Sequence, residues 1–361
     1  MKKTKNTIKL VAVLTLSLLT LIIFSRSYPN MDLKSILLRF QWPYLFVAAM
    51  SFVFYLLSET FAFSYLLKVN GHKIPVGRIF GYTLHDYFFS TITPGGSGGQ
   101  PGQFYAMQRD RIPPAHCLTT LFTFNAVYHI AMLFIAVWAM TMGATQMVAK
   151  IPAMKMLTVY GIGAQILFVA LLTALLLTED LVPKGIFLFF HGIRRIPLLK
   201  KFACTQEKLQ QQCEEYQVSS AFIKSNPIVF LKTFIYILPM LLFFYAIPYC
   251  LYRGLGYHHL GLWQMIAIQS VAVVALESVP LPGSVGVGEL SLTAVYALII
   301  PLPEAFVLMF LTRALHLYFG LLLSAIGVLT MKEKPILREG KSLKKLDKNK
   351  IGIVRKAEFV Q

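Results

Sequence analysis

The sequence predicts an all-helical polytopic membrane protein. Hydrophobic residues make up 56% of the 361 residues and charged residues only 14%, which is too little polar surface for a soluble globular protein. Several apolar stretches are long enough to cross a hydrocarbon layer of about 30 Å. Two stretches rich in glycine and proline interrupt this pattern. We therefore expect about eight transmembrane helices with two broken or re-entrant segments, arranged as an internal repeat.

The predicted spans begin with an apolar run at residues 10–24 that follows four lysines. The Ser-Arg-Ser sequence after it is a poor cleavage site, so we expect a retained anchor, with a cleaved signal peptide as the alternative. A shorter apolar segment at 79–92 has 14 residues, too few to cross the membrane, and 290–300 is short as well. The remaining spans are predicted at about 43–67, 117–142, 154–178, 227–250, 262–279 and 305–329.

Charge sets the predicted topology and domain organisation. Residues 1–330 are expected to form one membrane domain, with halves at about 1–178 and 227–330 and a cytoplasmic connector at 179–226 that lies partly on the membrane surface. Residues 331–361 carry ten basic and four acidic residues and form a basic tail. Basic residues favour the cytoplasmic side, so both termini are expected there, in the cell membrane. The net charge of +18 is expected to attract anionic lipid headgroups.

The two glycine-rich stretches are the predicted functional loops. Residues 94–102 contain five glycines and two prolines, and residues 280–289 repeat a Pro-Gly pair followed by spaced glycines. Irregular backbone at membrane depth is tolerated only inside protein or beside a watery cavity. Interrupted segments in corresponding halves point to a transporter site at the midplane, although the first stretch also fits an ordinary connector outside the membrane. Close backbone approach and N–H groups that can face a phosphate explain the glycines. The candidate binding residues in the loops are Gly95, Gly96, Gly98, Gly99, Gly283 and Gly286.

Ionisable residues inside apolar segments are the second set of candidates, because a charge at the bilayer centre costs at least about 2.5–3.5 kcal/mol. Each has a structural alternative. Glu59 can reach the headgroups, Asp86 can face water, and Arg313 can form a buried pair with Glu289 or Glu277. His129 and His316 are more typical of packing residues than of ligands. The candidates for substrate binding are Glu59, Asp86, Glu277, Glu289 and Arg313.

No motif in the sequence indicates a metal, a cofactor or a catalytic residue. The four cysteines lack C-x-x-C spacing, and neither glycine loop carries the lysine of a P-loop. The Gly-Gly-Ser-Gly-Gly sequence at 95–99 matches a nucleophile elbow formally, but that motif requires a strand before it and a helix after it in a soluble α/β sheet. We expect no cofactor.

The two loop motifs resemble those of the lysylphosphatidylglycerol synthase transmembrane-region family. The resemblance rests on TPGGSGG at 93–99, on PLPGSVGVGE at 280–289 and on the later Arg313, and it covers about residues 8–329. It implies a flippase-like membrane domain, with functional acidic residues at Glu59 and Glu289. In the full-length family enzyme a separate soluble domain transfers lysine from lysyl-tRNA to phosphatidylglycerol, and no stretch of this sequence corresponds to that domain.

Two functions remain open from the sequence. The first is binding or translocation of a phospholipid or lipid-linked headgroup, such as the aminoacylated lipid lysyl-phosphatidylglycerol. The alternative is an enzyme, a phosphatidylglycerol lysyltransferase or its membrane subunit, that contributes to resistance to cationic peptides. The expected partners are membrane phospholipid, anionic headgroups at the basic loops and tail, a separate soluble transferase and a second copy of the chain.

Overall fold

The computed structural model describes residues 33–178, 181–185, 188, 206–277 and 279–331. Over these residues the fold is helical, and the only extended pairing is an isolated bridge between Pro94 and Pro282. The all-helical prediction is confirmed. The predicted anchor at 10–24, the basic tail and most of the surface segment expected around 186–202 lie outside the described residues.

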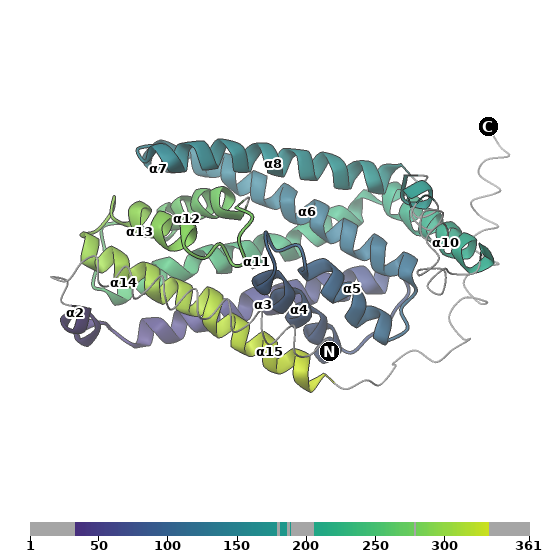
Figure 1. Ribbon diagram of the computed structural model, residues 1–361, viewed down its shortest axis with the longest axis horizontal. Helices are drawn as coiled ribbons and strands as arrows, with labels where there is room; N and C mark the ends of the chain where they lie inside the picture. The colour runs from purple at the N-terminus through teal and green to yellow at the C-terminus, as the bar shows by residue number, and fades with distance from the viewer. Residues whose placement is uncertain (1–32, 179–180, 186–187, 189–205, 278, 332–361) are drawn as a thin grey trace, which may run out of the picture.

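Five helices in the described part of the chain are long and apolar enough to cross a membrane. Proline occupies one of the first two positions of each. Proline suits a helix start because its missing N–H would have no partner there. In Figure 1 these helices run along the long axis of the molecule. They are α3 (Pro43–Val69), α6 (Pro114–Thr141), α8 (Pro152–Leu177), α11 (Pro227–Gly254) and a last span made of α14 (Leu302–Arg313), a π-helical segment (Ala314–Phe319) and α15 (Gly320–Thr330).

The two ends of the bundle are marked by shorter helices. The polar helix α10 (Gln206–Ser225) lies at one end, and α2 (Leu33–Arg39) and α7 (Ala144–Val148) lie at the other (Figure 1). We refer to these as the α10 end and the α7 end. Helix α10 packs against α6, α8 and α11, so part of the predicted 179–226 connector is an ordered helix fixed to the membrane domain.

Two pairs of shorter helices are inserted between the spans from opposite ends. Helices α4 (Val76–Ile92) and α5 (Gly99–Arg109) lie toward the α10 end, and α12 (Leu262–Glu277) and α13 (Val287–Tyr296) lie toward the α7 end (Figure 1). The longest of the four has 17 residues, or about 25 Å, which falls short of a bilayer crossing. The predicted count of eight spans is therefore not confirmed.

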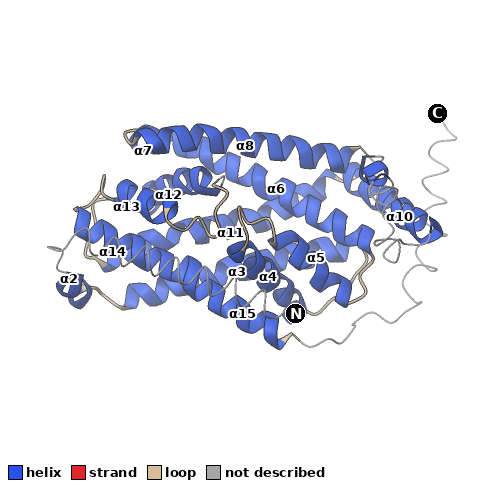
Figure 2. Cartoon of the chain, viewed as in Figure 1, coloured by secondary structure: helices blue, strands red, loops and turns tan. Residues whose placement is uncertain are grey.

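The loops that join these half-helices lie near the middle of the long axis, surrounded by helices (Figure 2). The last span supports the first pair from the side, because its glycines allow a close approach to α4. A Cβ at Gly320 would lie 2.5 Å from the ring of Tyr87, and one at Gly327 would collide with Leu84. Small residues at helix crossings permit this kind of contact in membrane proteins.

Candidate functional site

The two glycine loops meet at their tips. Pro94 and Pro282 form the antiparallel bridge between them, and each proline is followed by a glycine with φ of +56°, Gly95 and Gly283. The next residue in the second loop, Ser284, also has a positive φ of 52°, a conformation that non-glycine residues rarely adopt. The same turn therefore occurs twice, in loops that approach each other from opposite ends of the bundle.

Hydrogen bonds in the loops follow the same pattern. The N–H of Ser97 donates to the carbonyl of Pro94, and the N–H of Val285 donates to the carbonyl of Pro282, each at 3.2 Å. After the turn, α5 and α13 begin. The turn after each proline thus has the same conformation, although the two sequences share little beyond Pro-Gly; the loops differ just before the next helix, where φ is −88° at Gly98 and +88° at Gly286.

The glycines of the first loop differ in what they accommodate. A Cβ at Gly99 would collide with Ser90 Oγ and lie 2.5 Å from Asp86 Oδ1, and one at Gly98 would lie 2.6 Å from the side chain of Thr93. Close backbone approach explains these two glycines. In contrast, a Cβ at Gly96 would have no neighbour nearer than 3.9 Å. Its φ of +68° is the constraint there.

Gly286 in the second loop resembles Gly96, because its backbone conformation requires glycine and no close neighbour does. Nothing lies within 4 Å of its Cβ position, and its φ is +88°. Gly283 combines both constraints, because its φ is positive and a Cβ would lie 2.8 Å from Leu317. Close approach therefore does not account for Gly96 or Gly286, which are required by backbone conformation.

Arg313 pairs with Glu289 rather than with Glu277. The Nε of Arg313 donates to Glu289 Oε1 at 3.0 Å, and its Nη2 donates to the carbonyl of Gly283 at 2.6 Å. The other oxygen of Glu289 accepts the N–H of Gly286 at 2.6 Å, at the start of α13. Glu289 is 1% exposed. Arg313 and Glu289 thus fix the second loop to the last span as a neutral pair.

Asp110 is a buried charge that the sequence did not single out. It closes the open end of the α4–α5 pair, where Arg78 donates to it through Nε at 2.6 Å and Nη2 at 2.5 Å and the hydroxyl of Tyr82 donates as well. Asp110 is fully buried. The two charges are 32 residues apart, with Arg78 in the first turn of α4 and Asp110 at the end of α5, so their pairing is visible only once the two helices are folded together.

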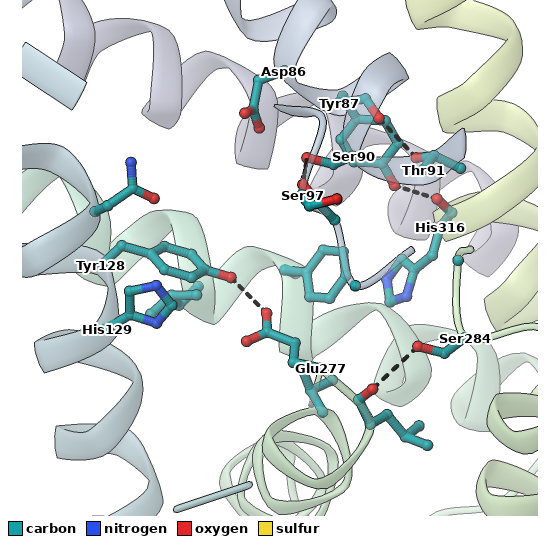
Figure 3. Close-up of a pocket in the computed structure, with 18 of the residues that line it drawn as sticks. Asp86, Tyr87, Ser90, Thr91, Ser97, Tyr128, His129, Glu277, Ser284 and His316 are labelled. Atoms are coloured by element: carbon teal, nitrogen blue, oxygen red, sulfur yellow. Dashed lines mark hydrogen bonds between the residues drawn. The ribbon is translucent and has the colours of Figure 1, made fainter. Parts of the chain in front are cut away.

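A central cavity of about 700 Å³ brings most of the predicted residues together. Its walls come from both half-helix pairs and from α3, α6, α8, α11 and the last span (Figure 3). Gly98, Gly99, Gly286 and Glu289 do not line it. The predicted residues that do are Glu59, Asp86, Gly95, Gly96, Gly283, Glu277, Arg313 and the two histidines His129 and His316.

Glu277 is held at one side of the cavity by neutral donors. The hydroxyl of Tyr128 donates to Oε1 and the amide of Gln165 donates to Oε2, each at 2.9 Å (Figure 3). Gln165 also bonds to the ring of His129. Tyr128 and Gln165 were not predicted from the sequence. Gln165 is a polar residue on a strongly apolar helix, and that was the available signal.

Glu59 and Asp86 form the acidic side of the cavity nearer the α10 end. Glu59 on α3 is 2% exposed, and its Oε1 has no hydrogen-bond partner among the described residues. Asp86 on α4 is a charged neighbour of Glu59. Neither carboxyl group forms an ion pair with a described residue. A buried carboxylate without a counter-charge is costly. Among the described residues Glu59 has only a hydrogen bond with Thr83, so it calls for a cation or a proton, and the partly buried Asp86 beside it adds to this requirement.

The mouth of the cavity opens sideways. The exposed residues that line it come from the glycine loops, the start of α5 and α8. The opposite wall, formed by Met240 and Leu241 of α11, is buried. The exposed part of the lining therefore lies on α8 and on the loops, which Figure 1 shows near the middle of the spans. The exposed lining residues are Gly95, Gly96, Ser97, Pro101, Phe168 and Leu281.

The fold and the cavity define a multi-pass helical membrane protein with a polar site between its spans. The part of the chain that the structure describes has no group of three or more metal-binding side chains. The chain belongs to the lysylphosphatidylglycerol synthase transmembrane-region family, whose model matches residues 8–324. A UPF0104 membrane protein of Archaeoglobus fulgidus is 24% identical over 330 residues, which cover 88% of this chain and 95% of that relative. The family places the chain among membrane proteins of lipid metabolism.

Proposed function

We propose that this protein binds the headgroup of a membrane lipid in the central cavity and translocates the lipid across the membrane. The observation that carries the proposal is the lateral mouth between α8 and the glycine loops. An opening at mid-depth of the spans faces hydrocarbon, and Phe168 on its rim is 47% exposed. A lipid can place its headgroup inside while its tails stay in the bilayer. A water-soluble solute gains nothing from such an opening.

Charge favours a cationic headgroup. Glu59, Asp86 and Glu277 line the cavity, and the positive charge of Arg313 is compensated by Glu289. The site is therefore acidic, which suits an aminoacylated phospholipid such as lysyl-phosphatidylglycerol and disfavours an uncompensated anionic lipid. Arg313 uses Nε and Nη2 within the protein, so we assign contact with the lipid phosphate to its Nη1.

The two half-helix pairs supply the moving parts. We propose that they are inverted repeats, because they enter from opposite ends, share a turn and meet beside the cavity. Relative movement of the pairs would expose the site to one side of the membrane and then to the other. Basic residues favour the cytoplasmic side, so we infer from those near the α10 end that this end faces the cytoplasm, and we propose the same side for both termini from their lysines and arginines.

Lipid translocation in proteoliposomes tests the proposal. We expect the purified chain to move fluorescent lysyl-phosphatidylglycerol and to move phosphatidylglycerol at least about tenfold more slowly, because two unpaired carboxylates repel an anion. Asp86→Asn should reduce translocation of the cationic lipid, whereas Glu214→Gln on the exposed face of α10 should not. Equal rates for both lipids, or no translocation at all, would contradict the proposal.

The same preparation distinguishes translocation from synthesis. Supplied with lysyl-tRNA and phosphatidylglycerol, the chain should form no lysyl-phosphatidylglycerol if the cavity only binds and moves lipid. Product formation by the chain alone would support the lysyltransferase alternative.

A further inference from the structure

We propose that Gln103 and Glu59 form a recognition subsite for a primary amine that has an oxygen acceptor close by in the same headgroup. The subsite would make the cavity selective for amino headgroups over trimethylammonium headgroups. This inference rests on the proposed function, because it names the chemistry that the same cavity selects. Gln103 would then be a specificity-determining residue.

The first observation is a buried donor and a buried acceptor that both lack partners. Gln103 on α5 is 1% exposed, and its Nε2 has no hydrogen-bond partner among the described residues. Glu59 is 2% exposed, and its Oε1 has none either. Both residues line the cavity. Leaving a buried polar atom unpaired costs about 1–3 kcal/mol, and more for a charged group, so a ligand that satisfies both atoms is favoured.

The second observation is that three helices bring these groups to one side of the cavity. Asp86 neighbours Glu59, and the carboxyl group of Asp86 also lies against Gly99 at the start of α5. Gly99 and Gln103 are four residues apart on this helix and so share a face. Asp86 thus lies between Glu59 and the start of α5, the helix that carries Gln103, and all three side chains line the cavity.

The chemistry of the ligand follows from this arrangement. A primary ammonium offers three N–H donors and a positive charge to the two carboxyl groups, whereas a trimethylammonium offers the charge but no donor. The amide N–H of Gln103 requires an oxygen acceptor near that amine. Two lipid classes provide this combination: an aminoacyl ester, through its α-amine and ester carbonyl, and an ethanolamine lipid, through its amine and phosphate oxygens.

Aromatic residues on the facing walls do not supply this selectivity. Tyr55, Phe124 and Tyr128 also line the cavity, and aromatic rings attract ammonium groups of either type. Aromatic attraction alone would retain choline headgroups as well as amines. Discrimination between the two must therefore come from the hydrogen-bonding groups.

Binding of short-chain lipids to the full-length protein in detergent tests the inference. The probes are the dihexanoyl forms of phosphatidylethanolamine, phosphatidylcholine and phosphatidylglycerol, together with lysyl-phosphatidylglycerol, and calorimetry gives each affinity. We expect the wild type to bind at least one amino lipid about tenfold or more tightly than the choline lipid. Comparison of the two amino lipids distinguishes an ester carbonyl from a phosphate oxygen as the acceptor.

Substitution of Gln103 provides the decisive comparison. Gln103→Met keeps the size but removes the donor, and should lower the affinity for the amino lipid about tenfold. The choline lipid should be nearly unchanged, because its trimethylammonium cannot donate to Glu59 and so does not bring its phosphate beside Gln103. Gln211→Met on the exposed face of α10 is the matched control and should change neither affinity. If Gln103→Met does not fold, Gln103→Leu tests the same point, because it also removes the donor without adding a charge.

The outcomes separate this inference from the proposed function. An unchanged ratio of amine to choline affinity in a folded Gln103 variant would overturn the inference and leave Gln103 as a structural residue that binds water only. Translocation without amine selectivity would do the same while the proposed function stands. Selective amine binding that depends on Gln103, in a protein that moves no lipid, would support the subsite and refute translocation.

Discussion

Removal of one member of the Arg313–Glu289 pair should destabilise the protein strongly, because it leaves the other as a buried unpaired charge. In Arg313→Met, Glu289 keeps only the N–H of Gly286 at 2.6 Å and stays buried. In Glu289→Gln, Arg313 keeps the carbonyl of Gly283 at 2.6 Å but loses its counter-charge. Breaking a buried pair from one side costs about 3–5 kcal/mol, so each single variant should lose roughly that amount.

The double variant should recover most of this loss. A glutamine at position 289 still offers an oxygen to Gly286, and a methionine at position 313 fills space without a charge. What remains lost is chiefly the hydrogen bond to Gly283, worth about 1 kcal/mol. The two substitutions should therefore be strongly non-additive.

Thermal unfolding in detergent, with all variants measured side by side, gives the interaction free energy between Arg313 and Glu289. At about 2 °C per kcal/mol for a long chain, each single variant should melt roughly 6–10 °C below the wild type and the double variant about 2 °C below it. Additive losses in the double variant would refute the reasoning. Translocation of lipid by a stable double variant would show that Arg313 serves only to hold the second loop.

Three further predictions follow from other parts of the structure. Asp110→Asn should lower the free energy of unfolding by about 3 kcal/mol, because it removes the charge that pairs with Arg78 at the open end of α4 and α5. The first glycine loop should then become sensitive to proteolysis. Unchanged protease resistance would contradict this role of the Arg78–Asp110 pair. Gly99→Ala should abolish translocation because its Cβ collides with Ser90, whereas Gly163→Ala should be neutral because nothing lies within 4 Å of that Cβ. A neutral Gly99→Ala beside a damaging Gly163→Ala would contradict the close approach of α5 to Ser90. Burial lowers the pKa of His72 below its unfolded value of about 6.5, so its stabilising contribution is present above that pH and decreases as pH falls toward 5. The melting temperature should therefore drop over this range. If His72→Asn does not reduce the drop, His72 is not the group responsible.

The sequence predicted the loops better than the number of spans. Pro-Gly pairs between apolar segments indicated two turns that only glycine-rich backbone could make, and the structure places both beside one cavity. Hydropathy could not separate a half-helix from a crossing, because α12 is as apolar as a true span over its 16 residues. The distinction depends on where the chain goes after Glu277, which is a tertiary property.

The candidate site was likewise predictable from the sequence only in part. The cost of burying charge identified Glu59, Asp86 and Glu277 as cavity residues, and it allowed two partners for Arg313. Choosing Glu289 over Glu277 required the position of α13 relative to the last span. Gln103 and Gln165 were not found, because a neutral amide in a helix carries no comparable penalty and is informative only when its surroundings are known.

If the two half-helix pairs move against each other as proposed, the contact between Pro94 and Pro282 affects how the membrane voltage acts on this protein. Proline has no backbone N–H, so neither residue at the bridge can itself donate a hydrogen bond to the facing loop, and the pairing depends on the residues beside the two prolines. If the proposed cavity is hydrated from either side in turn, most of the transmembrane potential falls across these two loops rather than across the whole bilayer. A headgroup with one net positive charge then gains or loses about 2.3 kcal/mol per 100 mV in passing the tips, so the rate of its movement would vary steeply with voltage.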